Sequence, residues 1–265
     1  MLVIEVVISL IFILLLLSIL ASSVMEGVAR IFSLRNQRLE SALQNMLGDQ
    51  TEFNRFKKHP IYKQLEKPSN LNSEIFYSIF AGSILNWGSK KLLEEEIEKI
   101  QSPDLNSTLR LFLAESDGKI PEFRQKVILW YEQVMDRVRL GYKNFTKSIL
   151  FFIGLALAVG FNVDLIKIAQ NLSESQESRE VLITTSKNLV EEESQIDPQN
   201  LEKNVEIIKE FGPPTAQQIE WGWPKNSKIQ ITFLNILGWI LTAVGIVIGA
   251  PFWFDLLKKI LSMSR

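Results

Sequence analysis

The sequence predicts an all-α fold: a three-span integral membrane protein with a helical cytoplasmic domain on long stalk helices. Three observations predict it: three uncharged apolar stretches, an unequal distribution of basic residues around them, and apolar residues at helical spacing between them. Inside a bilayer the backbone has to satisfy its own hydrogen bonds, so continuous apolar stretches of this length form helices.

The middle stretch contains sixteen uncharged residues between Lys147 and Asp164. A helix rises about 1.5 Å per residue, so these residues cover about 24 Å of a hydrocarbon layer that is about 30 Å thick. The side chains of Lys147 and Lys167 would therefore extend toward the headgroups. We predict a transmembrane helix at residues 147–168, with a buried helix of a soluble domain as the alternative.

The two other stretches lie near the chain ends. Residues 6–25 and 229–254 carry no charge, and each stretch is long enough to cross a bilayer. We predict transmembrane helices at residues 1–28 and 229–257, and a cytoplasmic tail at residues 258–265.

The first stretch could instead be a signal peptide, because Ala21-Ser22-Ser23 resembles a small-residue cleavage site. Its apolar core is longer than the about 7–15 residues usual in signal peptides, and Glu5 stands where a basic residue is expected. We therefore predict that the first helix is retained.

The basic residues indicate the orientation of the spans. Residues 30–147 contain 19 Lys and Arg against 15 Asp and Glu, whereas residues 170–228 contain 6 against 11. By the positive-inside rule, the domain at residues 29–146 and the C-terminus are cytoplasmic, while the N-terminus and a helical loop at residues 169–228 are extracytoplasmic. The net charge of −1 argues against a nucleic-acid partner.

Apolar residues at steps of three and four continue two of the spans into the cytoplasm. One series runs from Val24 to Met46 and ends before Gly48, and the other starts after Pro121 and runs from Phe123 into the middle span. The second series predicts an uninterrupted helix of about fifty residues, on the order of 75 Å long. Together the two helices would form a rigid stalk.

An apolar segment at residues 75–87 is too short to span a bilayer. We predict that it is the buried core helix of the cytoplasmic domain; the alternative is a re-entrant or surface-lying segment. Two amphipathic helices at residues 90–100 and 105–114, separated by Ser102-Pro103-Asp104, would pack against it.

The extracytoplasmic loop is expected to hold spacer-like helices. Residues 173–194 predict a weakly amphipathic helix, and residues 201–208 predict a second one that Gly212-Pro213-Pro214 would end. Trp221 and Trp223 precede the last span, where indole rings favour the headgroup layer.

Small residues predict close helix packing in the membrane. Gly245 and Gly249 form a GxxxG spacing in the last span, which places two hydrogen side chains on one face. The contact could lie within one chain or between chains, and we predict a homo-oligomer. The middle span offers small residues for the opposite face, either Gly154 with Ala158 or Ala156 with Gly160.

Catalytic chemistry is not expected. The chain has no cysteine and its single histidine is His59, which excludes Cys-based and His-rich metal sites. Glu94-Glu95-Glu96 would be adjacent helical residues that point to different sides, as on a solvated face. We predict no enzymatic activity, no metal and no cofactor, and we expect His59 to be a helix-end or packing residue.

Four motifs carry a resemblance to a known family. They are His59-Pro60, Asp136-Arg137 ahead of the middle span, Asn162-x-Asp164 at its far end, and the terminal run Gly249, Ala250, Pro251, Phe252, Trp253, Phe254 and Asp255. With them the chain resembles a widespread family of bacterial membrane proteins that share a C-terminal GAPFWFDLL sequence. The resemblance implies a three-span, multi-pass protein of the bacterial plasma (inner) membrane, and it implies no reaction. Ile61-Tyr62 departs from the Leu-Ile that usually follows the His-Pro pair.

The terminal motif predicts a local distortion. Gly249-Ala250-Pro251 would loosen or kink the last span near its cytoplasmic end. Phe252-Trp253-Phe254 would then form an aromatic belt at the membrane interface.

The charged and amide residues of the motifs suit structural roles. Asp255 would form an ion pair with Arg137 or Arg139 at the foot of the middle helix. Asn162 and Asp164 lie at the edge of the middle span, so they would cap or anchor it rather than relay protons.

Two functions suit this organisation. The first is a non-enzymatic scaffold or anchor in the lipid bilayer that presents the cytoplasmic domain to an unidentified protein partner and self-associates. The second is a subunit of an oligomeric channel, which needs polar side chains at midplane depth; the spans offer Ser9, Ser18, Asn235 and Thr242. A transporter is less favoured because three spans show no inverted repeat.

Overall fold

The computed structural model describes residues 2–31, 34–48, 50–65, 71–85, 90–193, 195–219, 222–223 and 231–263. All regular structure in these ranges is helical, which confirms the all-α prediction. The chain divides into two compact units, a terminal unit of residues 1–31 with 145–265 and a central unit of residues 32–144.

The helices follow one another along the chain. The terminal unit holds α1 (Leu2–Ile31), α9 (Leu165–Glu174), α10 (Gln176–Glu192), α11 (Leu201–Gln218), α12 (Phe233–Ile248) and α13 (Ala250–Met263). The central unit holds α2 (Leu34–Leu47), α3 (Gln50–Lys58), α4 (Pro60–Gln64), α5 (Ser73–Phe80), the π-helix η2 (Ala81–Leu85), α6 (Lys90–Glu98) and α7 (Pro103–Glu115). Helix α8 (Ile120–Gly160) contributes residues to both units.

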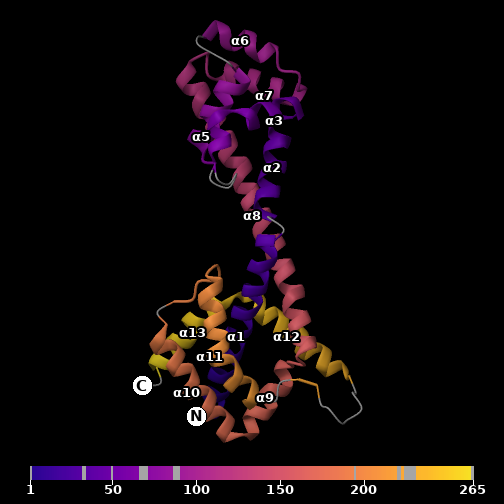
Figure 1. Cartoon of the computed structure of the whole chain (residues 1–265), viewed down its shortest axis with the longest axis vertical. Coiled ribbons are helices and arrows are strands. Elements are labelled where there is room, and N and C mark those ends of the chain that lie inside the picture. The colour runs from indigo at the N-terminus through magenta and orange to yellow at the C-terminus, as the bar shows by residue number, and fades with distance from the viewer. Residues whose placement is uncertain are drawn as a thin grey trace. The chain divides into compact units, whose positions relative to one another are not determined.

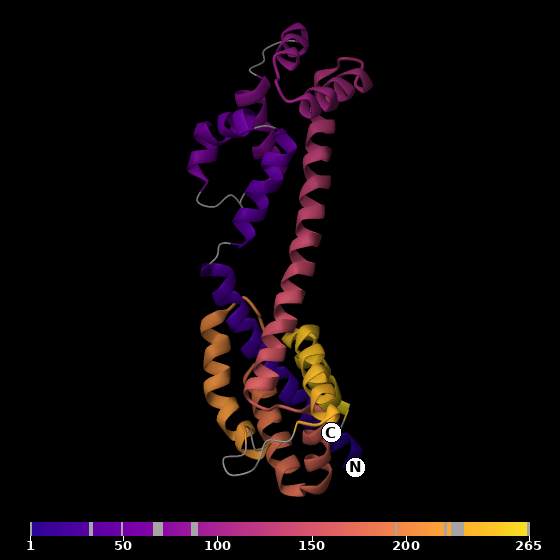
Figure 2. The same cartoon turned by 90° about the vertical axis from the view of Figure 1, so that its right-hand side faces the viewer.

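Helix α1 is the central element of the terminal unit. Most of its side chains between Ile8 and Met25 are buried, and α9, α10, α11, α12 and α13 all pack against it (Figure 1). Helix α11 also lies beside α1 in the second view (Figure 2).

The helices of the predicted loop at residues 169–228 are not spacers. Leu182 and Leu189 of α10, and Ile207 and Phe211 of α11, are buried in the same core as α1. Their spacing of seven and four residues places each pair on one face of its helix. The sequence predicts these helices, but their packing against the first helix is a finding of the structure.

An ion pair links α10 to the start of α1. Arg179 Nε lies 3.1 Å from Glu5 Oε2, and Arg179 Nη1 donates to the carbonyls of Leu172 at 2.6 Å and Ser173 at 3.3 Å. The guanidinium is buried, so these acceptors compensate the cost of removing its charge from water.

Helix α11 continues past its predicted end. It includes both Pro213 and Pro214 and extends to Gln218. Each proline leaves the carbonyl four residues earlier without its helical donor. Those carbonyls belong to Lys209 and Glu210, which are exposed, so water can satisfy them. The predicted stop at the proline pair is therefore wrong.

Two described helices, α1 and α8, are long and apolar enough to cross a membrane, and α12 with α13 is a third if the bent pair counts as one span. Helix α8 ends at Gly160 rather than continuing to residue 168. Among the eighteen most apolar consecutive residues of each helix, 61% are buried in α1 but only 11% are buried in α8. In the apolar part of α8, Phe152 and Val159 are exposed, whereas Leu150, Ile153 and Leu157 are partly buried against the core around α1.

The core of the central unit is aromatic. The ring of Phe76 lies 5.5 Å from Phe56, 5.5 Å from Phe80 and 4.3 Å from Tyr131. Phe76 and Phe80 belong to α5, and η2 adds the buried Ile84 and Leu85, so the part of the 75–87 segment that the structure describes is a core helix as predicted.

Helix boundaries in the central unit follow their capping residues. Ser102 Oγ accepts a hydrogen bond from the Leu105 N–H at 3.3 Å and starts α7. Gly48 follows α2 with φ +74°, a conformation that glycine adopts at low cost. The sequence predicts the boundary at Gly48, whereas the predicted second helix at residues 105–114 begins two residues later than α7 does.

Candidate functional site

A groove of about 830 Å³ in the central unit is the candidate docking site. Its long walls are one face of α2 and one face of α8, since the lining residues recur at steps of three and four, and α7 closes part of one side. The wall on each long helix extends over about three turns. The lining residues are Gln37, Arg38, Ser41, Ala42, Asn45, Met46, Asp104, Thr108, Trp130, Val134, Arg137, Val138 and Gly141.

The groove combines an apolar floor with a basic rim. Trp130 is held by an edge-on contact with Phe112, whose ring centroid is 6.0 Å away. Val134 and Val138 extend the apolar stripe along α8. Arg38 and Arg137 outnumber the single carboxylate of Asp104, so the lining carries a net positive charge. An apolar stripe of this length between two helices suits an amphipathic helix with acidic flanks.

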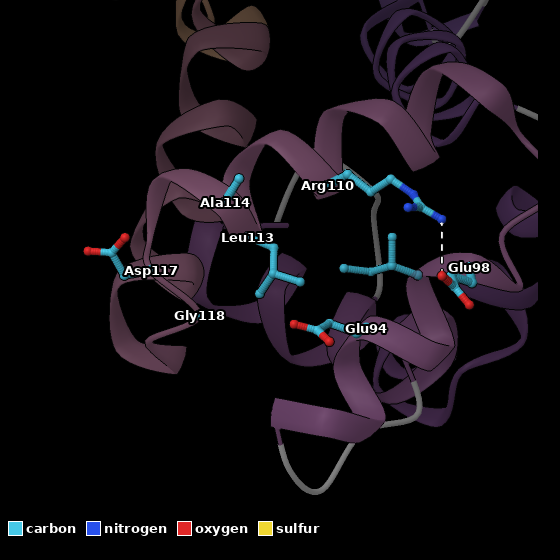
Figure 3. A pocket seen from close by; sticks show the side chains of 8 residues that line it. Glu94, Glu98, Arg110, Leu113, Ala114, Asp117 and Gly118 are labelled. Carbon is cyan, nitrogen blue, oxygen red and sulfur yellow. Dashed lines mark hydrogen bonds and ion pairs between the residues drawn. The ribbon is translucent and has the colours of Figure 1, made fainter.

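A second pocket, of about 420 Å³, lies between α6 and α7 (Figure 3). Arg110 Nη2 lies 3.5 Å from Glu98 Oε1, and Figure 3 shows the Asp117 carboxylate directed away from Glu94 and Glu98. Within the described ranges, no group of three or more acidic, His or Cys side chains is placed to hold a metal ion. The charged side chains that line the pocket are exposed to solvent.

His59 and Pro60 have a local structural role. His59 Nδ1 accepts a hydrogen bond from the Ile61 N–H at 3.3 Å, and Pro60 occupies the first turn of α4. A Cβ on Gly82 would lie 3.0 Å from His59 Nε2, so the glycine in η2 leaves room for the imidazole ring. The predicted helix-end role of His59 is confirmed.

Tyr62 of α4 is not suited to proton transfer near neutral pH. Burial, and then the nearby Glu40 carboxylate, raise the pKa of Tyr62 to about 12. The phenol therefore stays neutral at physiological pH.

The terminal motif forms a sharp break between α12 and α13. The two helices are bent by 90° at Gly249, whose φ of +102° strongly favours glycine. The break interrupts the helical hydrogen bonds, and two carbonyls find other donors. Trp253 Nε1 donates to the Gly245 carbonyl at 2.7 Å, and Ser18 Oγ donates to the Ile246 carbonyl at 3.4 Å. The predicted kink is present.

The aromatic residues after the break differ in environment. Phe252 is 49% exposed, whereas Phe254 is 1% exposed and packs in the core around α1, as does Ala250. The exposure of Trp253 is intermediate, because its ring turns back toward α12. The predicted belt of three aromatic side chains at one interface is therefore divided between surface and core.

Replacement of Trp253 by phenylalanine tests the role of its indole N–H. The phenyl ring keeps most of the packing but leaves the Gly245 carbonyl without this donor, so we expect a loss of about 1–2 kcal/mol of stability. Thermal unfolding of the detergent-purified protein measures it. Phe252→Leu, at an exposed position, is the control and should change stability by at most about 0.5 kcal/mol. Equal melting temperatures for the two variants would contradict this role.

The end of α8 is held by the segment before α12. Gly222 N–H donates to the Phe161 carbonyl at 2.9 Å, and Trp223 Nε1 donates to the Val159 carbonyl at 3.1 Å. Asn162, at φ +52°, donates in return from Nδ2 to the Gly222 carbonyl at 3.3 Å. These bonds join the end of α8 to the segment before α12. Trp221, the other predicted interface tryptophan, lies outside the described residues.

Asp164, from the Asn162-x-Asp164 motif, is a buried acceptor of hydrogen bonds. It is 3% exposed, and its Oδ1 accepts from the N–H groups of Ile166 at 3.0 Å and Lys167 at 3.1 Å. Its Oδ2 accepts from Asn235 Nδ2 at 2.9 Å. A Cβ on Gly238 would lie 1.7 Å from Oδ1, so a glycine is needed there. The carboxylate thus caps α9 and links it to α12. The sequence predicts a capping or anchoring role at the end of the middle span, whereas the structure places the cap at the start of a separate helix.

The charged pairs differ from the sequence prediction. Arg139 Nη1 lies 3.0 Å from Asp136 Oδ1, one turn earlier on the same helix. Arg137 lines the groove of the central unit, and Asp255 is exposed on α13. The ion pair predicted for Asp255 is therefore not among the described contacts.

The small residues predicted for helix packing contact different partners within the chain. A Cβ on Gly154 would lie 3.3 Å from Ile246 Cβ, and a Cβ on Gly245 would lie 2.7 Å from Leu14 Cδ2. Gly154 therefore lets α8 approach α12, and Gly245 lets α1 approach α12. Ala158 is fully buried, and Gly249 serves the break described above.

The polar residues considered for a channel donate to nearby acceptors. Ser9 Oγ donates to the Glu5 carbonyl at 2.9 Å, and Thr242 Oγ1 donates to the Val163 carbonyl at 2.9 Å. Ser18 and Asn235 bond Ile246 and Asp164 as stated above. In the sequence, polar residues inside apolar stretches indicate that such contacts form, but these residues alone do not identify the acceptors.

The chain was also compared with known proteins. No family model, curated protein or solved structure matches it.

Two features of the geometry bear on function. The central unit contains a basic groove with an apolar floor, and the terminal unit presents apolar side chains on α8 and α12. Both features are surfaces suited to binding.

Proposed function

We propose that the protein is a non-enzymatic anchor of the bacterial plasma membrane that presents its central unit to a protein partner on the cytoplasmic side. The observation that carries the proposal is the set of exposed apolar side chains on α8 and α12 of the terminal unit, because exposed apolar surface is where a membrane or a partner binds. Its residues include Phe152 and Val159 of α8, and Phe233, Leu234, Ile236, Ile240, Leu241, Val244 and Ile248 of α12.

The distribution of charge limits where lipid can touch the terminal unit. Charged side chains are costly in a bilayer, so α10 and α11 are expected to face water while α8 and α12 face lipid. The exposed charged residues of α10 and α11 include Glu177, Glu180, Lys187, Glu192, Glu202, Lys203, Glu206, Lys209 and Glu210. The small residues that predict self-association have partners within the chain, so a homo-oligomer is not part of the proposal.

The groove between α2 and α8 supports a particular kind of partner. Trp130 and Val134 would contact the apolar stripe of a bound helix, and Arg137 at the rim would pair with its carboxylates. Tryptophan and arginine are the residue types that most often dominate binding energy. The partner is therefore proposed to present an acidic amphipathic helix.

Site-specific photo-cross-linking in cells tests the docking groove. A photoreactive residue at Val134 should give a discrete adduct, whereas one at Gln125, which is exposed and does not line the groove, should give none. Arg137→Glu should reduce the Val134 adduct about tenfold or more, because like charges would meet. Arg139→Glu, outside this groove, is the matched control.

The membrane part of the proposal has a separate test. After alkaline washing of membranes, the protein should remain in the pellet. Release of the protein into the supernatant would overturn the membrane anchor. Equal cross-linked adducts at Val134 and Gln125 would overturn the docking groove.

A further inference from the structure

A second groove lies in the terminal unit, between α8 and α12. It has a volume of about 760 Å³, within the about 300–1,000 Å³ range of small-molecule sites. Each wall is one helix face, because the lining residues recur at steps of three and four. They are Lys147, Ser148, Phe151 and Phe152 of α8, and Val244, Val247 and Ile248 of α12.

The groove is polar at one end and apolar elsewhere. Lys147 and Ser148 stand at the start of the uncharged stretch of α8, and Phe151 and Phe152 follow one turn later with their rings edge to face at 5.7 Å. On α12, the lining residues are the last ones before the break at Gly249. The lysine therefore lies where the apolar surface of α8 begins, which is the depth of the lipid headgroups if α8 crosses the bilayer.

We propose that this groove binds an anionic phospholipid, with an acyl chain along the apolar walls and the phosphate paired with Lys147. The inference rests on the membrane placement proposed above. An apolar slot facing lipid is filled by acyl chains, and a basic residue between helices at the cytoplasmic side attracts anionic headgroups. The positive charge at the mouth selects an anionic over a zwitterionic lipid.

A second copy of the chain suits the groove less well. Most paired copies are related by a two-fold axis, so the same surface patch meets itself. Such a contact through this groove would place one Lys147 side chain from each copy in the same interface without supplying an opposite charge for either, and this like charge would oppose the contact. A phospholipid brings the opposite charge.

The test uses the full-length protein in nanodiscs that contain phosphatidylcholine with a minor fraction of phosphatidylglycerol. After transfer to mild detergent, native mass spectrometry counts the retained lipid of each kind. We expect phosphatidylglycerol to be retained preferentially and Lys147→Gln to reduce its retention about fivefold. Lys143→Gln removes the same charge one turn earlier, outside the groove, and should have little effect. Val247→Trp fills the apolar part and should abolish retention of both lipids.

A disulfide checks that the groove walls are in place. The Cβ positions of residues 154 and 246 lie 3.3 Å apart, close to the about 3.5–4.5 Å of disulfides, and the chain has no other cysteine. Gly154→Cys with Ile246→Cys should therefore form an intramolecular bond in the nanodisc.

The outcomes separate this inference from the proposed function. Suppose that the disulfide forms in the bilayer. If the Lys147 and Lys143 variants then retain the same amount of phosphatidylglycerol, the lipid site is overturned and the anchor stands. The same holds if the protein retains phosphatidylcholine and phosphatidylglycerol to the same extent. If cross-linking at position 247 joins two copies of the chain, the lipid site is also overturned, because a second copy would then occupy the groove. Release of the protein by alkaline washing would overturn the anchor itself.

Discussion

Alanine at position 164 is expected to destabilise the terminal unit by about 3 kcal/mol. The change removes the N-cap of α9, worth about 1 kcal/mol, and the charged acceptor of Asn235, worth about 1.5–3 kcal/mol. Because Asp164 is buried, water does not replace these bonds. Thermal unfolding of the detergent-purified protein, followed by circular dichroism, measures the loss.

Two further variants show whether the effect belongs to this site. Asp255→Ala removes an exposed carboxylate of the same unit and should change stability by at most about 0.5 kcal/mol. Gly238→Ala should destabilise the protein as Asp164→Ala does, because the added methyl group would displace the carboxylate. If Asp164→Ala and Asp255→Ala unfold at the same temperature, the linking role of Asp164 is wrong.

Truncation of Phe76 to alanine is expected to have the largest effect in the central unit, about 3–5 kcal/mol. The ring is fully buried among Phe56, Phe80 and Tyr131, and the change would leave a cavity lined by these three rings. The loss should appear as a lower unfolding temperature and as faster proteolysis within residues 32–144.

A leucine on the surface of the same unit provides the control. Leu111 is 54% exposed, so Leu111→Ala removes apolar side chain from the surface without creating a cavity and should change stability by at most about 0.5 kcal/mol. Equal proteolysis rates for the Phe76 and Leu111 variants would contradict the assignment of Phe76 to the core.

Local patterns predict the central unit well. Helix α7 has the serine cap and the apolar spacing that its structure requires, and α2 ends directly before Gly48. In both cases the determining contacts lie within a few residues of the helix end. Such signals are complete in the sequence itself.

Local patterns do not predict contacts between segments that are far apart in the sequence. The position of Asp164 at the edge of an apolar stretch predicts a cap or anchor, but it does not predict that Asp164 caps a separate helix or that it bonds Asn235, 71 positions away. The burial of Leu189 and Phe211 depends on α1, and a short apolar stripe does not specify which surface will cover it. Only the packed arrangement shows that the helices of the predicted loop and the first helix share a core.

The burial of α1 by later helices has a consequence for biosynthesis. Residue 31 ends α1, whereas Leu261, one of the residues in its core, is made 230 residues later. At about 5–20 residues per second, α1 waits about 10–50 s for its last partners. The segment 32–144 is contiguous and has its own core, so it can fold on the ribosome during that interval. The nascent first helix therefore needs a temporary apolar host, either the insertion machinery, lipid or a chaperone, until translation is nearly finished.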